Sequence, residues 1–267
     1  MAKFTEADLA GILRGAAASA TAIGKLTDTY DLDLPGAYRV QRLNIDHRVA
    51  AGERIAGLKM GFTSKAKMAQ MGLNDVIWGI LTDAMAVGDG PYDLGGLIHP
   101  KVEPEIVFRI GRRVDDPADA SSAEAAVDAV ALGYEILDSR FQDYKFALPD
   151  VVADNASAAG FGIGPWHPVV RAPAGDESPT DTDISDVPVT LSVNGEPVSS
   201  ASTAAILDDP WESLRSAVRL ASGAGIVPEP GWIVLAGGIT AAVPLNPGDV
   251  ITVTADGLGS AELRTSR

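Results

Sequence analysis

Two glutamates at alternating positions of a strand-like segment are the first candidates for chemistry. In residues 101–110, KVEPEIVFRI, an extended backbone places Glu103 and Glu105 on one face, about 7 Å apart. Two like charges at that distance raise each other's proton affinity unless a cation lies between them, and oxygen ligands suit a hard ion such as Mg²⁺ or Mn²⁺. The spacing therefore indicates a candidate divalent-metal site.

A third acid would complete a set of metal ligands, and two acids compete for that position. Glu135 lies in the apolar run GYEIL, where an unpaired carboxylate is costly, and Asp138 follows three residues later. The alternative interpretation is that Glu103 and Glu105 line the solvated face of an edge strand, which Pro104 would favour. The spacing alone leaves these alternatives open.

Lys59 is the other charged residue in a position that indicates function. It lies in GLKMGFTS among apolar residues and glycines, so it either faces an anionic ligand, is neutralised by burial, or is a surface lysine with a covered stem. The histidines His47, His99 and His167 have no zinc-ligand spacing, so a zinc site is not supported.

Other kinds of chemistry are excluded by what the sequence lacks. The chain has no cysteine, which removes thiol nucleophiles and thiolate metal sites, and all-oxygen ligation is expected for any metal. It has no G-x-S-x-G, and no G-x-G-x-x-G that follows a strand and begins a helix. Acyl-serine chemistry and dinucleotide binding are therefore not expected.

Helices are predicted before a glycine-rich β body. Apolar residues at helical spacing behind Thr5 predict a first helix, and Pro35 is placed to begin a second one that ends near Gly52. Ser121 or Ser122 is placed to cap a helix through residues 123–130, with a strand over residues 132–138.

The second half of the chain is predicted to be mainly β-structure. Asn194-Gly195 predicts the turn of a hairpin within residues 188–198, and Asp209-Pro210 begins a helix that ends near Gly223. The expected fold is α+β, with an N-terminal helical segment over residues 1–54 and a β-rich catalytic body, a mixed β-sandwich or roll, over residues 55–267.

The charge balance excludes several partners. Asp and Glu number 36 against 21 Lys and Arg, and the net charge of −15 repels nucleic acid and anionic membranes. No uncharged apolar run approaches the ~18 residues needed to span a bilayer, so a cytoplasmic protein is expected. The acidic stretch over residues 175–186 is interpreted as a solvated loop.

Several blocks of sequence resemble a known family. In chain order they are GLKMGFTSKAKMAQMG, HPKVEPEIVF, EILDSRF, LPDVVADNASAAGF, VNGEPV and GDVITVTADGLGS. They resemble the 2-keto-4-pentenoate hydratase and 4-oxalocrotonate decarboxylase family of the fumarylacetoacetate hydrolase superfamily, from about Leu9 to Leu263. The resemblance implies the fold of that superfamily and a Mg²⁺- or Mn²⁺-dependent enzyme of aromatic meta-cleavage pathways that acts on short 2-keto acids.

The resemblance also implies roles for individual residues. The family's metal carboxylates correspond to Glu103, Glu105 and Glu135, its lysine to Lys59, and the serine of its A-D-N-A-S block to Ser157. Lys59 would pair with an anionic group of the substrate, or form a Schiff base. A homo-oligomer, or a complex with a partner hydratase that receives the product, is expected from the same resemblance.

Between the two activities of the family, the resemblance favours decarboxylation. Hydratases of the family carry an Asp before an aromatic-Gly pair, where this chain has Ile77 before Trp78-Gly79. The decarboxylases are more similar here and in IHPKVEPEI, LPDVVADN and AGGITAAV. The expected reaction converts 2-oxo-3-hexenedioate, a small 2-keto dicarboxylate, to 2-hydroxypenta-2,4-dienoate and CO₂. The alternative is hydration of 2-hydroxypenta-2,4-dienoate, in which Asp75 could replace the missing acid.

The remaining expectations concern substrate binding and lower alternatives. Ile77 and Trp78 would leave the departing carboxylate poorly hydrated, and the other candidate substrate-binding residues are Arg140, Lys145 and Thr240. A C–C bond hydrolase would need a histidine near the first helices, where His47 lies. A non-enzymatic acidic module with structural Ca²⁺ is the lowest alternative.

Overall fold

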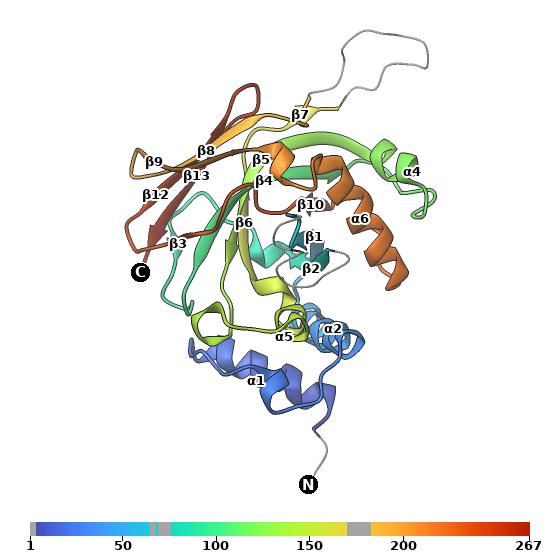
Figure 1. Ribbon diagram of the computed structural model, residues 1–267, viewed down its shortest axis with the longest axis vertical. Coiled ribbons are helices and arrows are strands. Elements are labelled where there is room, and N and C mark those ends of the chain that lie inside the picture. Colours follow the sequence, from blue (N-terminus) through green and yellow to red (C-terminus); the bar gives the residue numbers. More distant parts are fainter. Residues whose placement is uncertain (1–3, 65–67, 69–75, 170–182) are drawn as a thin grey trace.

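The first helices of the chain lie at one end of the molecule, next to two β-sheets (Figure 1). The computed structural model describes residues 4–64, 68, 76–169 and 183–267. Helix α1 is Glu6–Ala18 and begins at a capping box between Thr5 and Asp8. Helix α2 is Leu34–Ala50, with the side chain of Asp33 capping the amide of Gly36 and a proline in its first turn. The predicted starts of both helices are confirmed.

The larger sheet has the strand order β2-β1-β10-β4-β5-β6, with β11 beside β4 and β7 beside β5. Its strands are β1 (Ile55–Gly61), β2 (Ile77–Thr82), β4 (Lys101–Ile110), β5 (Val127–Leu137), β6 (Ala158–Ile163), β7 (His167–Pro168), β10 (Ile233–Leu235) and β11 (Val243–Pro244). Strands β1 and β10 are parallel, and the other pairs are antiparallel. Strand β4 therefore lies inside the sheet, between β10 and β5.

The smaller sheet has the order β3-β13-β12-β8-β9. Its strands are β3 (Tyr92–Asp93), β8 (Pro188–Val193), β9 (Glu196–Ser202), β12 (Val250–Ala255) and β13 (Gly259–Ser266). The hairpin β8–β9 turns at Asn194 and Gly195, whose φ angles are +53° and +87°. Asparagine and glycine tolerate this left-handed backbone, so the predicted turn is confirmed.

The prediction for residues 121–130 is wrong in its bounds. Helix α4 is short, Ala120–Ala125, and is capped by Asp119 rather than by Ser121 or Ser122. Strand β5 already begins at Val127 and pairs with β4 along its length. Nearly every residue of β5 is buried, and a strand buried on both faces reads as a continuous apolar run that periodicity alone does not distinguish from a helix.

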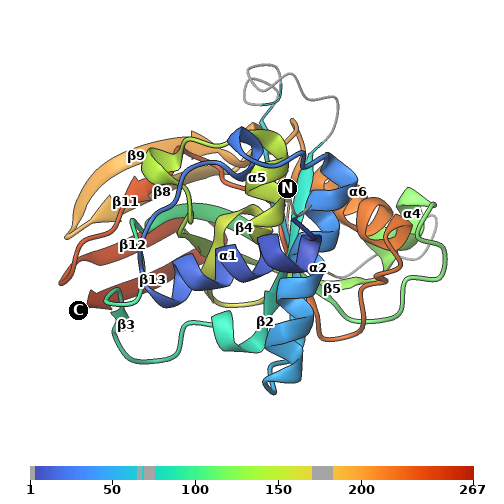
Figure 2. The same cartoon turned by 90° about the horizontal axis from the view of Figure 1, so that it is seen from below.

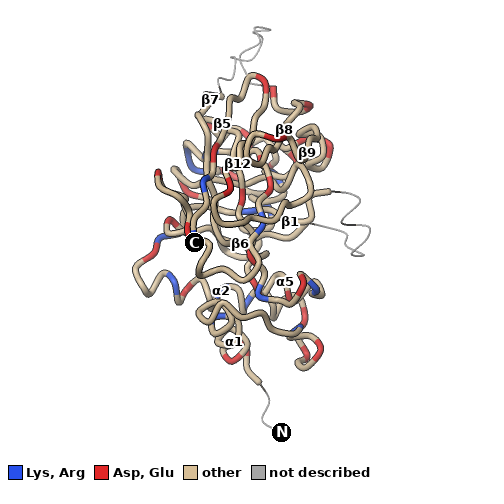
Figure 3. Tube along the Cα trace, turned by 90° about the vertical axis from the view of Figure 1, so that its left-hand side faces the viewer, with Lys and Arg blue, Asp and Glu red and all other residues tan. Residues whose placement is uncertain are grey.

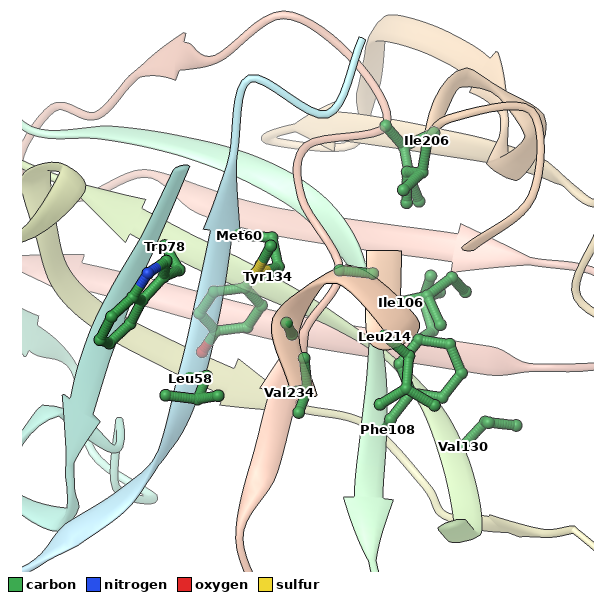
Figure 4. Close-up of a cluster of buried hydrophobic side chains, with 14 of the residues drawn as sticks. Leu58, Met60, Trp78, Ile106, Phe108, Val130, Tyr134, Ile206, Leu214 and Val234 are labelled. Carbon is green, nitrogen blue, oxygen red and sulfur yellow. The ribbon is translucent and has the colours of Figure 1, made fainter. Parts of the chain in front are cut away.

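Helix α6 (Pro210–Gly223) packs on the larger sheet and closes the main hydrophobic core (Figure 4). The ring of Phe108 on β4 lies 4.8 Å from that of Trp211 at the start of α6, and Leu214 and Val234 are fully buried beside them. The helix begins at Asp209-Pro210 and ends at Gly223, as the sequence predicts. This core fixes the strands β10 and β4 rigidly next to each other.

A second core joins α1 and α2 to helix α5 (Leu148–Ala153), and Figure 2 shows α1 and α2 together at that end. It includes Leu13, Val40, Phe141, Val152 and Ile77 of strand β2. The helical segment is thus packed against an edge strand of the larger sheet, and it holds the connection that follows β5 in place.

Charged residues occur along the whole trace, with acidic ones at both the helical and the sheet ends (Figure 3). No helix among the described residues is long and apolar enough to cross a membrane. Asp75 and most of the acidic stretch 175–186 lie outside the described residues, as does most of the segment SKAKMAQM.

Candidate active site

The register of β4 and β5 brings three glutamates together. Glu103 lies directly opposite Glu135, and Glu105 is two residues further along β4 on the same face. One carboxylate oxygen from each of these residues lies within 4.8 Å of the others, and Glu105 and Glu135 are fully buried. The edge-strand interpretation of Glu103 and Glu105 is wrong, because β4 lies between two neighbouring strands.

Asp138, the competing acid, has a different part in the structure. Its carboxylate accepts hydrogen bonds from the amides of Ile98, at 3.1 Å, and of His99, at 2.8 Å. It therefore fixes the loop before β4 and is not part of the glutamate cluster, which we define as Glu103, Glu105 and Glu135.

The glutamate cluster is electrostatically unsatisfied. Oε2 of Glu105 accepts a hydrogen bond from the amide of Gly237 at 2.8 Å, but Oε1 of Glu105 and Oε1 of Glu135 have no partner among the described residues. Burial, reinforced by the neighbouring carboxylates, raises the pKa of Glu105 well above its ordinary value. Burial also raises the pKa of Glu135 to about 7, although Lys59 opposes this. Unpartnered carboxylate oxygens that converge in this way fit a hard divalent cation.

Two glycines after β10 make room for the cluster. A Cβ at Gly238 would lie 2.4 Å from the carboxyl carbon of Glu103, and Gly237 has a φ angle of +108°. A side chain at Gly238 would therefore displace the Glu103 carboxylate, and one at Gly237 would be strained. This requirement explains why AGGIT carries a glycine pair here.

Lys59 of β1 provides one positive charge beside the three carboxylates. Its Nζ is 2.9 Å from Oε2 of Glu135 and donates to the carbonyl oxygen of Ala156, also at 2.9 Å. Burial alone would lower the pKa of Lys59, but Glu135, Glu105 and Glu103 together raise it above its ordinary value. Lys59 is only 2% exposed, so the surface-lysine interpretation is wrong.

The carbonyl that binds Lys59 belongs to a left-handed turn, which we define as Asn155, Ala156 and Ser157. Their φ angles are +51°, +51° and +61°, a backbone that costs residues other than glycine roughly 1 kcal/mol each. The amide side chain of Asn155 pairs with both backbone groups of Ile80, with 2.8 Å for each hydrogen bond. A Cβ at Gly79 would lie 2.8 Å from the carbonyl oxygen of Asn155, so β2 can approach only because a glycine is there.

A cavity of about 190 Å³ opens beside the glutamate cluster and Lys59. Its polar wall comprises Lys59, Lys101, Glu103, Tyr144 and Ser157. Its apolar wall includes Phe62, Ile77, Leu137, Phe146 and Val151. Oγ of Ser157 is buried and has no hydrogen-bond partner in the described part of the chain. The sequence-predicted residues Lys59, Ile77, Glu103 and Ser157 are thus brought together around one cavity.

Other predicted substrate-binding residues do not line this cavity. Trp78 stacks on Tyr38, with ring centroids 5.2 Å apart, because it is on the opposite face of β2 from Ile77. The side chain of Lys145 is 75% exposed and pairs with Asp143. Thr240 is within hydrogen-bond distance of the hydroxyl of Ser199, at 3.1 Å.

Arg140 is also directed elsewhere. It forms a buried ion pair with Asp154 and donates to the carbonyl oxygen of Asp154 at 2.8 Å. Burial raises the pKa of Asp154 to about 6, although Arg140 opposes this. Arg140 lines a different cavity, of about 450 Å³, together with His47. The predicted anion anchors Arg140 and Lys145 therefore have partners within the chain.

Sequence reasoning missed two polar residues of the smaller cavity. Lys101 is two residues before Glu103 on the same face of β4, so the alternation that identified the glutamates could also have identified it. Tyr144 was not accessible to such reasoning, because a turn in which Asp143 and Tyr144 have φ angles of +54° and +55° directs it into the cavity.

Comparison with known proteins identifies relatives of this chain. This chain is 44% identical to a 4-oxalocrotonate decarboxylase from a Pseudomonas species over 252 aligned residues. The alignment covers 94% of each chain. Over 241 residues it is 35% identical to a 2-keto-4-pentenoate hydratase from Paraburkholderia xenovorans, covering 89% of this chain and 86% of the relative.

Solved structures agree with the sequence comparison. The 4-oxalocrotonate decarboxylase from Pseudomonas putida G7, complexed with magnesium and adipate, matches 97% of each chain with a TM-score of 0.87 and 36% identity. The same enzyme complexed with calcium and acetate matches with a TM-score of 0.85. The family model described as fumarylacetoacetate (FAA) hydrolase C-terminal matches residues 84–265, which contain the glutamate cluster and the left-handed turn. The chain belongs to the fumarylacetoacetate hydrolase family.

Proposed function

We propose that this protein is a divalent-metal-dependent carboxy-lyase that converts 2-oxo-3-hexenedioate to 2-hydroxypenta-2,4-dienoate and CO₂. The observation that carries the proposal is the glutamate cluster, whose buried, unpartnered oxygens converge beside a cavity that also holds Lys59. The relative with 44% identity and the solved structure with 36% identity are both named 4-oxalocrotonate decarboxylase. That solved enzyme is complexed with magnesium and with adipate, a six-carbon dicarboxylate.

Glu103, Glu105 and Glu135 would hold the cation, Mg²⁺ or Mn²⁺, because they offer only oxygen ligands and their excess charge requires a positive partner. When bound, the cation would supply a Lewis acid that polarises the 2-oxo acid end of the substrate. The fully buried positions of Glu105 and Glu135 keep water away from these carboxylates, and the amide of Gly237 orients one of them.

The reaction breaks the bond between C5 and C6 of the substrate. The C6 carboxylate leaves as CO₂. The electron pair of the broken C5–C6 bond passes through the C3–C4 alkene to the C2 carbonyl oxygen, which takes up a proton. The apolar wall at Ile77 and Phe146 keeps bulk water away from the carbon chain of the substrate as CO₂ leaves. Ser157 can donate a hydrogen bond to the substrate through its unpartnered Oγ.

Lys59 acts as an ammonium group in this proposal. Nζ is paired with the carboxylate of Glu135, which favours the ammonium form, whereas a Schiff base requires the neutral amine. Two of its N–H groups face Glu135 and Ala156, so one remains for an anionic oxygen of the substrate. Lys59 therefore stabilises negative charge that develops on the 2-oxo acid.

The hydratase activity is less well supported by the cavity. Hydration needs an acid or base at the far end of the substrate, and the position where the sequence comparison expects it is Ile77, an apolar wall residue. Among the described residues that line the cavity, Glu103 alone carries a carboxylate. Glu103 belongs to the glutamate cluster, so it is not placed to act as that acid or base. The hydratase relative nevertheless makes hydration the activity to test against.

In the test, the purified protein is incubated with Mg²⁺ and either 2-oxo-3-hexenedioate or 2-hydroxypenta-2,4-dienoate. We expect CO₂ release from the first compound and no loss of the second one's diene absorbance. Hydration of the second without CO₂ release from the first would replace the decarboxylase proposal with the hydratase. Metal-dependent melting with neither reaction would favour a non-enzymatic metal-binding module.

We also propose a cytoplasmic homo-oligomer, or a complex with a hydratase. The product, 2-hydroxypenta-2,4-dienoate, is the enol form of the compound in the name of the hydratase relatives, so the two activities are consecutive. Leu43 and Val49 of α2 are exposed apolar side chains that an interface would cover. Light scattering of the protein alone, and mixed with a hydratase, tests for these assemblies; a monomer in both would contradict them.

A further inference from the structure

Lys101 is the cation in the cavity wall that no carboxylate of the described residues neutralises. By contrast, Lys59 pairs with Glu135, Arg140 with Asp154, and Lys145 with Asp143. Lys101 is partly buried, in a cavity whose wall is largely apolar. A positive charge in such a place is favourable only when an anion or water pairs with it.

The ring of Tyr144 holds this ammonium group in position. Nζ of Lys101 lies 4.0 Å from the centroid of the Tyr144 ring. The Tyr144 hydroxyl is 3.1 Å from the carbonyl oxygen of Leu137 and 3.2 Å from that of His99, and the His99 ring lies 4.7 Å from the tyrosine ring. Tyr144 is therefore fixed at both its ring and its hydroxyl, so Lys101 rests on a rigid surface.

Along β4, the backbone separation of Lys101 and Glu103 is similar to the length of a substrate. Lys101 and Glu103 are two residues apart on one face of β4, which separates them by about 7 Å at the backbone. An extended six-carbon chain with bonds of ~1.5 Å spans roughly 6 Å between its terminal carbons. Leu137, directly opposite Lys101 in β5, provides apolar wall beside the Lys101 end of the cavity.

We propose that Lys101, held over the ring of Tyr144, binds the far carboxylate of a six-carbon dicarboxylate whose 2-oxo acid end lies at the glutamate cluster. This inference rests on the proposed function and extends it, because it names the residue that selects dicarboxylates over monocarboxylates. A substrate of the hydratase reaction has no far carboxylate, so Lys101 would contribute to decarboxylase specificity. Lys101 replaces Arg140 and Lys145 as the anion anchor.

The experiment measures binding of two matched ligands that do not react. 2-Oxoadipate and 2-oxohexanoate share the 2-oxo acid end and differ in the far carboxylate, and each is titrated calorimetrically into the Mg²⁺-loaded protein. We expect wild type to bind 2-oxoadipate about 10- to 100-fold more tightly. Lys101→Met should reduce this ratio to about 1 and leave the Kd of 2-oxohexanoate within about twofold of wild type, while Lys101→Arg should retain most of the preference.

Arg109→Met is the matched control. Arg109 is a cation of the same strand that also lies over an aromatic ring, that of Trp166, but it pairs with Asp128 and does not line the cavity. Its substitution should leave the ratio of the two dissociation constants unchanged. An equal preference in Lys101→Met and wild type, or no preference in wild type, would overturn the inference.

Failure of the proposed function is a separate result. If wild type releases no CO₂ from 2-oxo-3-hexenedioate, the decarboxylase proposal fails, and the ratio of the two dissociation constants still decides the role of Lys101. If wild type releases CO₂ and Lys101→Met keeps the wild-type ratio, the function stands and the role of Lys101 is wrong.

Discussion

Two groups of buried charges meet at the left-handed turn, and they differ in their charge balance. At one end of the turn, Arg140 and Asp154 form a pair of one positive and one negative charge. At the other, Lys59 faces the three carboxylates of the glutamate cluster. The backbone of residues 154–156 links the two groups, because Lys59 binds the carbonyl of Ala156 and Arg140 that of Asp154.

The two groups differ in whether their charged atoms find partners within the described part of the chain. Both carboxylate oxygens of Asp154 accept hydrogen bonds, from the side chain and the amide of Arg140, so this pair needs nothing further. The glutamate cluster leaves oxygens of Glu105 and Glu135 without a hydrogen-bond partner and carries more negative charge than Lys59 offsets. Burial of charge is therefore no sign of function by itself, whereas an unbalanced buried group requires a ligand.

The largest effect is expected from Glu105→Gln. It should lower the Mg²⁺-dependent turnover of 2-oxo-3-hexenedioate by about 1,000-fold or more, because it removes one proposed ligand of the cation. The metal-free protein should be as stable as wild type or more so, since the substitution removes a charge that burial and two neighbouring carboxylates disfavour. Turnover and urea unfolding measure the two effects, with Glu196→Gln on the exposed strand β9 as control. Full turnover by Glu105→Gln in excess chelator would contradict the metal site.

Breaking the ion pair of Arg140 and Asp154 should lower stability and leave Mg²⁺ binding intact, the opposite of the outcome for Glu105→Gln. Asp154→Ala leaves Arg140 buried without a counter-charge and should reduce the free energy of unfolding by about 3–5 kcal/mol at pH 7. The folded fraction should still bind Mg²⁺. Replacing both partners, Arg140→Met with Asp154→Leu, should restore most of the loss. Urea unfolding of the three proteins is the measurement, and a loss below ~1 kcal/mol in Asp154→Ala would remove the distinction between the two groups.

Lys59→Met tests the comparison by removing the positive charge that faces the glutamate cluster. Without Lys59, the glutamate cluster has no positive partner among the described residues, so the metal-free protein should melt at a lower temperature. Added Mg²⁺ should then raise the melting temperature by more than it does in wild type, whereas turnover should fall by about 100-fold. Melting with and without Mg²⁺ measures the coupling; an identical Mg²⁺ response in both proteins would contradict it.

Asp249 is a carboxylate that neutral N–H groups stabilise, and its replacement should have the smallest effect on stability. It accepts hydrogen bonds from the amide of Asn246 at 2.9 Å and the side chain of Asn194 at 3.0 Å. Burial would raise the pKa of Asp249, but the N–H groups of Asn246 and Asn194 lower it below its ordinary value. Its stabilisation is therefore present above the unfolded pKa of ~3.9 and is lost as the pH falls through the lower folded value.

Asp249→Ala should accordingly cost about 1 kcal/mol of unfolding free energy at pH 7 and much less at an acidic pH at which Asp249 is protonated in the folded protein. Urea unfolding at the two pH values measures this difference. An equal cost at both would show that the Asp249 contribution does not depend on its charge.

The sequence predicts the elements that have local signals. Thr5 with Asp8, Asp209 with Pro210, and Asn194 with Gly195 are correctly placed because caps and turns depend on a few neighbouring residues. The start of β5 was misplaced because both of its faces are buried by distant parts of the chain.

The candidate site also has features that the local sequence predicts and features that depend on the fold. The alternation of Glu103 and Glu105 is local, and their burial is not, since it follows from the position of β4 inside the sheet. The direction of Tyr144 depends on a turn with positive φ angles at Asp143 and Tyr144, neither of which is glycine. No local sequence rule predicts such turns reliably, because the surrounding structure imposes them.

The most direct test of the central claim is to count the divalent ions that the protein binds. Mn²⁺ titration followed by electron paramagnetic resonance should show one tightly bound ion per chain in wild type, competed by Mg²⁺, and none at the same concentration in Glu105→Gln. Asp154→Ala, with its balanced pair broken, should retain the ion in its folded fraction. Equal Mn²⁺ binding by wild type and Glu105→Gln, or catalysis by a wild-type protein that binds no ion, would contradict the claim that the glutamate cluster is a metal site.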